Sequence, residues 1–187
     1  MVEIRELGII GALEFSPQIY SDDRGSFREW FNLQEIREKV NFPFPIAQGN
    51  VSHSKLGVIR GVHFSNSLKG QDKFVTCISG EIVDVLVDLR LESPTYLVKE
   101  YVSLLPSHGR SVYIPTGVGH GFVSRAEESI VCYLLSSEYD PQTEQAIFPF
   151  DADLDIEWNT EDPILSQRDA SAQSLVHAKN FGLLKQF

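Results

Sequence analysis

The chain has 187 residues, of which 42% are hydrophobic, and its 12 Phe and 6 Tyr are spread along its length. This is enough apolar material for one full core, so we expect a single domain spanning residues 1–187. The formal net charge of −10 argues against a nucleic-acid partner, which would need a basic stripe. An anionic ligand would therefore have to be bound by a few cations focused in one cleft.

The cysteine content and the start of the chain favour a protein of the reducing cytoplasm. Cys77 and Cys132 each lie inside an apolar, strand-like run, and we interpret both as small buried hydrophobes rather than a disulfide or a metal pair. The first residues do not combine a basic end with an apolar run, so we expect no signal peptide. No segment approaches the length of a membrane span, and we expect no membrane partner.

Residues 22–29 place charged side chains around a glycine turn. On spacing alone, Arg24 and Glu29 are typical of a solvated surface turn. The alternative is a phosphate clamp at Arg24, because the guanidinium fork matches phosphate oxygens.

A helix is expected over residues 33–40. Asn32 is a suitable N-cap, Glu35 follows three residues later, and Leu33, Ile36 and Val40 share one stripe. A second short helix is expected around residues 172–178.

A polar run that contains Gln48 and Asn50 precedes the apolar run of residues 58–64. The polar run is typical of an exposed loop entering a strand. Within the apolar run, a lone His63 would more often be a core histidine than a catalyst. Strict strand alternation also places Arg60 and His63 on opposite faces, so a site that uses both requires Gly61 to permit a bulge or bend.

From residue 74 to residue 136, short β-rich runs alternate with Gly, Pro and Ser punctuation. This pattern, with no long helix between the runs, predicts an antiparallel sandwich or barrel whose two sheets enclose a pocket. In residues 82–89, one face is fully apolar, and we expect the other face, which carries Asp84 and Asp88, to be mixed. The expected strands cover residues 74–78, 82–89, 97–105, 112–114, 121–123 and 130–135.

Four further side chains could be structural or chemical. Lys73, at a strand entrance, is either a snorkelling surface lysine or a cation that stabilises a developing oxyanion. Tyr133 and Tyr139 could simply fill space, and Asp169 alone is typical of a helix cap or a surface charge.

A metal site is the less favoured alternative. A metal-binding cupin would show two closely spaced histidines beside a carboxylate, whereas His63 and His120 each stand apart. We expect no metal.

Taken together, these segments resemble the dTDP-4-dehydrorhamnose 3,5-epimerase family, which are sugar-nucleotide epimerases of the cupin superfamily. The resemblance covers most of the chain, in order and at near-constant spacing. Its pieces are Asp23-Arg24-Gly25, Phe27, Glu29, Gln48, Asn50, Ser52, residues 58–64, residues 80–90, residues 93–95, Ile114-Pro115, His120-Gly121-Phe122, Tyr133, Tyr139, Pro141, Leu165-Ser166 and Asp169.

The resemblance implies a mainly β, double-stranded β-helix (jelly-roll) fold with a few short helices. It also implies a homodimer, a dTDP-sugar substrate, and no metal or organic cofactor. By the same resemblance, His63 is the general base oriented by Asp169, Tyr133 is the general acid, and Tyr139 stacks on the nucleotide base. The positions implied to line the sugar-nucleotide pocket are Arg24, Glu29, Gln48, Asn50, Arg60, Lys73, His120, Glu144 and Arg168.

The chemistry of these residue types agrees with the implied roles. A proton next to the C4 ketone is removable only if the enolate oxygen is stabilised, which a preorganised Lys73 can do. Histidine is the usual general base near neutral pH, and a carboxylate fixes its tautomer. Asp84, on its mixed strand face, is the alternative to Asp169 for that role.

Several positions depart from the family pattern. Leu134 stands where a Lys usually follows the tyrosine, Val51 replaces a common His, residues 147–150 replace a Trp-Asn pair, and residues 117–119 vary a common loop. Such changes are similar to relatives of secondary pathways that epimerise only C3 or only C5. The expected function is therefore epimerisation of a 4-keto-6-deoxyhexose at C3, C5 or both. Single-centre epimerisation, a related ketoisomerase and a non-catalytic carbohydrate-binding cupin are the alternatives.

Overall fold

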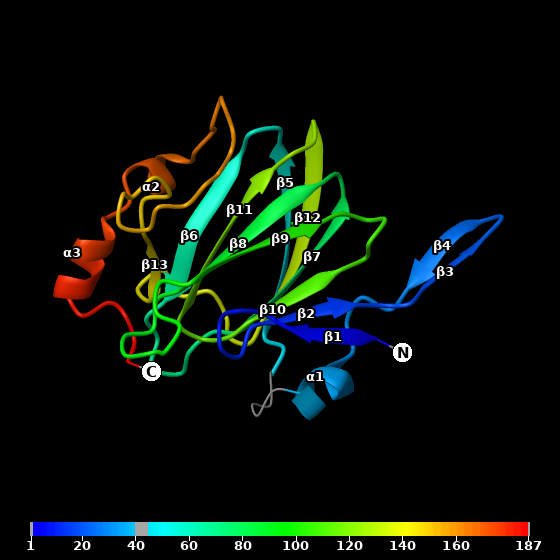
Figure 1. Cartoon of the computed structure of the whole chain (residues 1–187), viewed down its shortest axis with the longest axis horizontal. Coiled ribbons are helices and arrows are strands. Elements are labelled where there is room, and N and C mark those ends of the chain that lie inside the picture. The colour runs from blue at the N-terminus through cyan, green and yellow to red at the C-terminus, as the bar shows by residue number, and fades with distance from the viewer. Residues whose placement is uncertain (1, 40–44, 187) are drawn as a thin grey trace.

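The computed structural model describes residues 2–39 and 45–186, which fold mainly into antiparallel β-strands (Figure 1). One sheet has six strands in the order β1 (Glu3–Glu6), β2 (Leu13–Ser16), β10 (Ser111–Ile114), β7 (Lys73–Ser79), β12 (Glu128–Leu135) and β5 (Gln48–Lys55). The second sheet has five strands in the order β13 (Glu144–Ala146), β6 (Ile59–Ser65), β11 (Val118–Ser124), β8 (Ile82–Asp88) and β9 (Lys99–Leu104).

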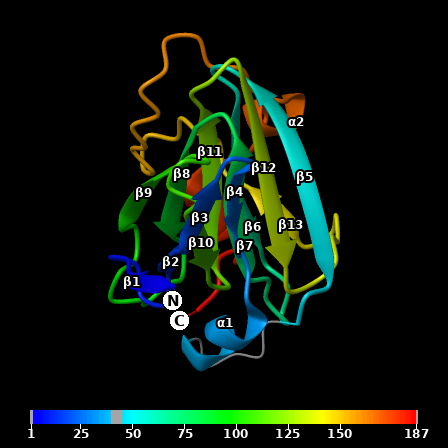
Figure 2. The same cartoon turned by 90° about the vertical axis from the view of Figure 1, so that its right-hand side faces the viewer.

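The two sheets face each other, and in Figure 2 the strands of both sheets are spread from side to side, with β5 at one edge. Alternate residues of both sheets meet in a central core, which includes Val75 and Val131 from one sheet and Leu86 and Phe122 from the other. This arrangement follows from the period of two along each strand. The mainly β, jelly-roll expectation is confirmed.

The outer faces of the sheets are covered to different extents. The C-terminal segment packs Leu154, Trp158 and Leu175 over the outside of the five-stranded sheet. Trp30, Phe31 and neighbouring apolar side chains cover part of the six-stranded sheet. The rest of the outer face of the six-stranded sheet is not covered by these side chains.

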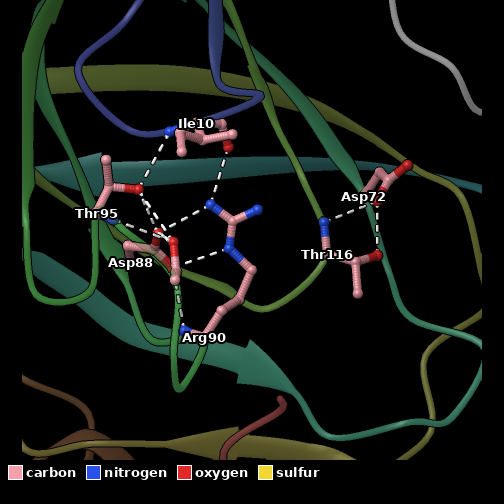
Figure 3. A network of polar contacts seen from close by, with 7 residues as sticks. Ile10, Asp72, Asp88, Arg90, Thr95 and Thr116 are labelled. Atoms are coloured by element: carbon pink, nitrogen blue, oxygen red, sulfur yellow. Dashed lines mark hydrogen bonds and ion pairs between the residues drawn. The ribbon is translucent and has the colours of Figure 1, made fainter. Parts of the chain in front are cut away.

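The strand β8 differs from the expected mixed pattern. Asp84 and Asp88 are both fully buried, because their face of β8 points between the sheets and not to solvent. Asp88 accepts hydrogen bonds from Arg90 Nε at 2.8 Å and from Thr95 Oγ1 at 2.7 Å, and Arg90 Nη2 donates to the Ile10 carbonyl oxygen at 2.8 Å (Figure 3). This buried network ties the end of β8 to the N-terminal segment.

A two-stranded hairpin of β3 (Ile19–Asp22) and β4 (Gly25–Arg28) projects away from both sheets (Figure 1). Its aromatic side chains are open to solvent, since Tyr20 is 60% exposed and Phe27 is 70% exposed. Isolated hairpins of two strands have little stability of their own in water. The hairpin is thus a candidate surface for a partner.

The helices lie close to their expected positions. α1 (Leu33–Lys39) confirms the first helix, and its last expected residue, Val40, lies outside the described residues. α3 (Leu175–Asn180) starts three residues later than expected because Ser174 is its N-cap, and α2 (Gln167–Ala170) was not expected. None of the helices within the described ranges is long and apolar enough to span a bilayer.

Two sequence expectations about β5 and the cysteines need correction. Residues 48–55 form the edge strand β5 and not a loop, with polar residues alternating along it. Cys77 is buried as expected, but Cys132 is only half-buried, because it pairs with Thr76 on the outer face of its sheet while Cys77 lies in the central core. Both cysteines are free thiols.

Candidate active site

A cavity of about 220 Å³ lies between the two sheets. The five-stranded sheet contributes side chains from β6, β11 and β13, and the six-stranded sheet contributes side chains from β5, β7 and β12. The lining residues are Asn50, Arg60, His63, Gln71, Lys73, His120, Phe122, Tyr133, Leu135, Tyr139 and Glu144. Eight of the thirteen site residues expected from the sequence line this cavity, and the five that do not are Arg24, Glu29, Gln48, Arg168 and Asp169.

Arg60 and His63 line the same cavity although they are three residues apart on one strand. On the neighbouring β11, His120 pairs with His63 and Phe122 pairs with Arg60, so between these pairs one residue of β11 opposes two residues of β6. Gly61 provides the irregularity with a φ of 129°, and a Cβ at Gly61 would lie 2.5 Å from the Cα of Gly121. Only glycine tolerates this conformation and this close approach. The expected bulge at Gly61 is confirmed.

His63 is paired with Asp169. The Nε2 atom of His63 lies 2.6 Å from Oδ1 of Asp169, which is nearly buried at the start of α2. Burial raises the pKa of Asp169, but the hydrogen bond and charge of His63, helped by Ser166 and the Gly61 backbone, outweigh it and leave the pKa below its usual value. An ionised Asp169 accepts the proton on Nε2, which leaves Nδ1 of His63 as the nitrogen able to accept another.

A second imidazole–carboxylate pair lines the cavity beside the first. Nε2 of His120 lies 2.6 Å from Oδ1 of Asp84, and Asp84 is completely buried. Oδ2 of Asp84 has no hydrogen-bond partner among the described residues. Asp84 therefore contacts His120, and the carboxylate at the ring of His63 is that of Asp169.

Lys73 enters the cavity from the start of β7 and is only 7% exposed. Burial lowers the pKa of its ammonium group, while the negative charges of Glu144 and Asp84 act in the opposite direction. The preceding residue, Asp72, fixes the entrance to the strand by accepting hydrogen bonds from the Thr116 backbone N–H at 2.8 Å and its hydroxyl at 2.6 Å (Figure 3). Tyr113 donates a third bond to Asp72 at 2.8 Å.

Tyr133 faces the cavity from β12, on the sheet opposite His63. Burial raises the pKa of its phenol, and the charges of Asp84 and Cys132 act in the same direction. The nearby Ser52 hydroxyl and the charge of Arg60 lower the pKa, and the net change is upward. The phenol is therefore protonated at neutral pH and can serve as a proton donor.

The chain matches the model of the dTDP-4-dehydrorhamnose 3,5-epimerase family over residues 6–177. It belongs to this family. The family consists of isomerases, so the sequence-based identification of family and enzyme class is confirmed.

Relatives of two kinds are similar to the chain over nearly all of its length. A dTDP-4-dehydrorhamnose 3-epimerase of Streptomyces niveus is 42% identical, covering 100% of this chain and 90% of the relative. A dTDP-4-dehydrorhamnose 3,5-epimerase of Mycolicibacterium smegmatis is 43% identical, covering 96% and 89%. Among solved structures, a 4-keto-6-deoxy sugar epimerase from the novobiocin biosynthetic gene cluster of Streptomyces spheroides superposes with a TM-score of 0.97 at 42% identity, covering 100% of this chain and 94% of that one.

The remaining residues that the family resemblance pointed to form three groups. Tyr139, 53% exposed, stands at the cavity rim, and its backbone N–H donates to Gln48 Oε1 at 2.7 Å. Gln48 and Arg168 lie behind the lining: Gln48 Nε2 donates to Asn50 Oδ1 at 2.8 Å, and Arg168 Nη2 donates to the Glu144 carbonyl oxygen at 3.2 Å.

Arg24 and Glu29 do not reach this cavity. Arg24 lies at the tip of the projecting hairpin, paired with Asp22 at 2.5 Å, and Glu29 accepts a hydrogen bond from Asn32 at 2.9 Å near the base of the hairpin. The two residues therefore do not line the cavity of their own chain, since the hairpin projects away from the sheets (Figure 1), and their role in a sugar-nucleotide pocket stays a prediction.

Three lining residues were absent from the sequence-based set. Leu135 and Phe122 share the inward face with Tyr133 and His120, two residues away on the same strands, so alternation could have found them. Gln71 lies in a loop, where no periodicity exists to indicate it. Within residues 2–39 and 45–186, no group of three His, Cys, Asp or Glu is arranged to hold a metal ion.

Proposed function

We propose that this family member epimerises a dTDP-4-keto-6-deoxyhexose at C3, C5 or both, by removing a proton next to the C4 ketone and returning one to the opposite face. The observation that carries the proposal is that His63 and Tyr133 line one cavity from two opposing sheets. An inversion requires a proton acceptor and a proton donor on the two sides of one carbon, and this arrangement supplies both.

The base in the proposal is Nδ1 of His63. Its other nitrogen is held at 2.6 Å by the nearly buried Asp169, which also stabilises the imidazolium that forms. This is the role of the carboxylate in other imidazole–carboxylate pairs.

Lys73 is proposed to stabilise the enolate oxygen that forms from the C4 ketone. Its side chain is buried, and a preorganised charge that is shielded from solvent has a much larger effect than one in bulk water. Both proton transfers leave the oxidation state of the sugar unchanged, and the protein itself supplies the charge stabilisation. The proposal therefore involves no metal or organic cofactor.

The proton donor is the Tyr133 phenol. A non-catalytic carbohydrate-binding module has no need for a base and an acid that face each other, so their pairing favours an enzyme. Relatives that act at C3 alone and at both centres are equally similar to this chain, which keeps single-centre epimerisation as the second candidate.

We also propose a homodimer in which the hairpin of one copy completes the pocket of the other. The cavity of about 220 Å³ is below the range of roughly 300–1,000 Å³ that is typical of ligand pockets, so it holds the sugar and leaves the diphosphate at the open rim. Arg24, carried on a hairpin with exposed Tyr20 and Phe27, is suited to reach a diphosphate on a second copy.

The uncovered outer face of the six-stranded sheet supports the same dimer. Val51 is 61% exposed and Ile78 is 45% exposed on this face, and Cys132 lies between them half-buried. An exposed apolar face next to a projecting hairpin is typical of a protein–protein interface. Sedimentation velocity at micromolar concentration tests the dimer, and a single monomeric species would contradict it. The single domain and the cytoplasmic location expected from the sequence stay predictions.

Solvent deuterium exchange into dTDP-4-keto-6-deoxyglucose, followed by NMR, tests the reaction. Deuterium at both C3 and C5 supports double epimerisation, and deuterium at one centre supports the single-centre alternative. No exchange would reject catalysis on this substrate and favour a binding module. His63→Ala should abolish exchange while nucleotide binding is preserved, and exchange retained by that variant would reject the assignment of the base.

A further inference from the structure

The inner face of β5 presents a row of polar side chains to the cavity side of the sheet: Gln48, Asn50, Ser52 and Ser54. In the antiparallel ladder with β12, Asn50 pairs with Tyr133 and Ser52 pairs with Val131. Ser52 is thus the diagonal neighbour of Tyr133 on the same face, a position within reach of a long side chain.

The other members of the row already have hydrogen-bond partners. Gln48 is bonded to Asn50 at 2.8 Å, and Ser54 Oγ accepts from Arg60 Nε at 3.1 Å. Ser52 differs from them, because its Oγ is buried and has no partner that meets hydrogen-bond geometry in the described part of the chain. A buried hydroxyl without a partner costs about 1–3 kcal/mol, so its retention calls for a reason.

We propose that Ser52 is a positioning residue for Tyr133, and that its hydroxyl donates a hydrogen bond to the phenol oxygen after the phenol has given its proton to the sugar. In that step the O–H bond of Tyr133 breaks, a C–H bond forms at the enolate carbon, and the electron pair of the O–H bond stays on the phenolate oxygen. Ser52 keeps its own proton throughout. This inference rests on the proposed function and adds a residue to it.

The polar surroundings of Tyr133 support this role. Ser52 and the charge of Arg60 both lower the pKa of the phenol, which means that they stabilise the phenolate, whereas burial, Asp84 and Cys132 raise it. The other charged or titratable side chains that line the cavity with Tyr133 are His63, Lys73, His120, Tyr139 and Glu144.

Ser52 is better suited than Arg60 to donate a hydrogen bond to the phenolate, because Arg60 also has other partners. The Arg60 guanidinium is shared with Ser54 and with the carbonyl oxygen of His53 at 3.0 Å, at the open edge between β5 and β6. The Ser52 hydroxyl carries no charge at any working pH and has no competing acceptor among the described residues.

The test compares Ser52→Ala with the rescue variant Ser52→Thr and the matched control Ser103→Ala. Ser103 is a half-buried serine on β9 that does not line the cavity. We expect Ser52→Ala to lower kcat about 10- to 100-fold with little change in KM, as for loss of a hydrogen bond to a charged group. The high-pH limb of its rate profile should move to higher pH, because the phenol loses a group that stabilises its ionised form.

Solvent deuterium exchange separates the two faces of the sugar. Ser52→Ala should still incorporate deuterium into the substrate on the face next to His63. The epimerised product should form slowly. Ser52→Thr should recover most of the rate, and Ser103→Ala should match the wild type. Wild-type kcat and an unmoved pH limb in Ser52→Ala would overturn the inference.

A second measurement is independent of turnover. In protein with carbon-13-labelled tyrosine, the phenol resonance of Tyr133, assigned with Tyr133→Phe, should titrate at a higher pH in Ser52→Ala than in the wild type, and Ser52→Thr should reverse this change. An unchanged titration in Ser52→Ala would overturn the role of Ser52. A wild-type protein that fails to exchange the substrate would instead overturn the proposed function, so the two failures are distinguishable.

Discussion

His120 Nε2 lies 2.6 Å from Oδ1 of Asp84, so the cavity contains a second imidazole held by a buried carboxylate, next to the His63–Asp169 pair. The two pairs differ in what surrounds the acid. Asp84 lies between the sheets, where its charge acts on both Lys73 and Tyr133, whereas Asp169 is reached mainly by His63 and its own helix. Asp84 is therefore placed to set the electrostatic potential of the cavity.

Replacement of Asp84 by Asn should move the high-pH limb of the rate profile to lower pH. The charge of Asp84 raises the pKa of Tyr133 and of Lys73, so its removal lowers both. This shift is opposite in sign to the one expected for Ser52→Ala. Steady-state rates across pH 6–10, compared with the surface variant Asp153→Asn, check the sign, and an unmoved limb would contradict the assigned role of Asp84.

Replacement of Lys73 by Met should stabilise the protein and abolish its activity. Lys73 is buried, its pKa is lowered by desolvation, and it has no hydrogen bond or ion pair with another described residue. A well-packed apolar side chain in place of a buried charge is commonly stabilising by about 1–4 kcal/mol. A rise of a few degrees in Tm with loss of turnover would confirm the trade-off. A lower Tm would show that Lys73 is needed for the fold.

Mixing two inactive variants should restore activity if the hairpin serves the second copy. In a mixed dimer of His63→Asn and Arg24→Ala, one pocket combines an intact His63 with an intact Arg24, and the other pocket has neither. Random pairing of equal amounts of the two chains then restores about one quarter of the wild-type sites. Turnover after unfolding and refolding the mixture measures this, with each variant refolded alone as the control. No recovery would place Arg24 outside the partner's pocket.

The free energy of unfolding should decrease at acid pH, because the buried Asp88 becomes protonated. Burial raises the pKa of Asp88, but hydrogen bonds from Arg90, Thr95 and Ser93 outweigh it, and the pKa lies below its usual 3.8. The stabilisation is therefore fully present above pH 3.8 and is lost as the pH falls through the lowered pKa of the folded state.

Asp88→Asn tests this dependence. The variant should be about 3–5 kcal/mol less stable near neutral pH, because it leaves the partner arginine buried without its counter-charge. The difference from wild type should shrink below pH 3.8. The exposed Asp155, paired with Lys99, is the matched control, and Asp155→Asn should cost less than about 1 kcal/mol. Urea unfolding at several pH values measures both.

Local sequence patterns were sufficient for the β-architecture and for most of the cavity. Strand periodicity located β7, β8, β10, β11 and β12 within a few residues, and the conflict between Arg60 and His63 required the bulge that Gly61 provides. Periodicity could not predict that Asp84 and Asp88 are buried. The alternation of residues along a strand is the same whether a carboxylate lies between two sheets or faces water. The partners that make burial possible, His120 and Arg90, are identified only by the tertiary fold.

The positions that depart from the family pattern are explained by their location. Leu134 points to the outer face of the six-stranded sheet and packs with the cluster around Phe74, and Val51 lies on the same open face. Ile147 belongs to the core outside the five-stranded sheet. These three substitutions therefore leave the cavity lining unchanged. No local signal in one chain could show that the hairpin carrying Arg24 points away from the pocket.

The location of His63 and Tyr133 on facing sheets makes the packing between the sheets part of the catalytic geometry. Side chains such as Val75, Leu86 and Val131, which never touch the sugar, fix the gap across which a proton must be delivered. Trimming one of them would let the layers settle closer together or tilt. Variation in this aliphatic layer could thus retune which carbon of the ring is presented to the acid while every polar residue of the cavity stays the same.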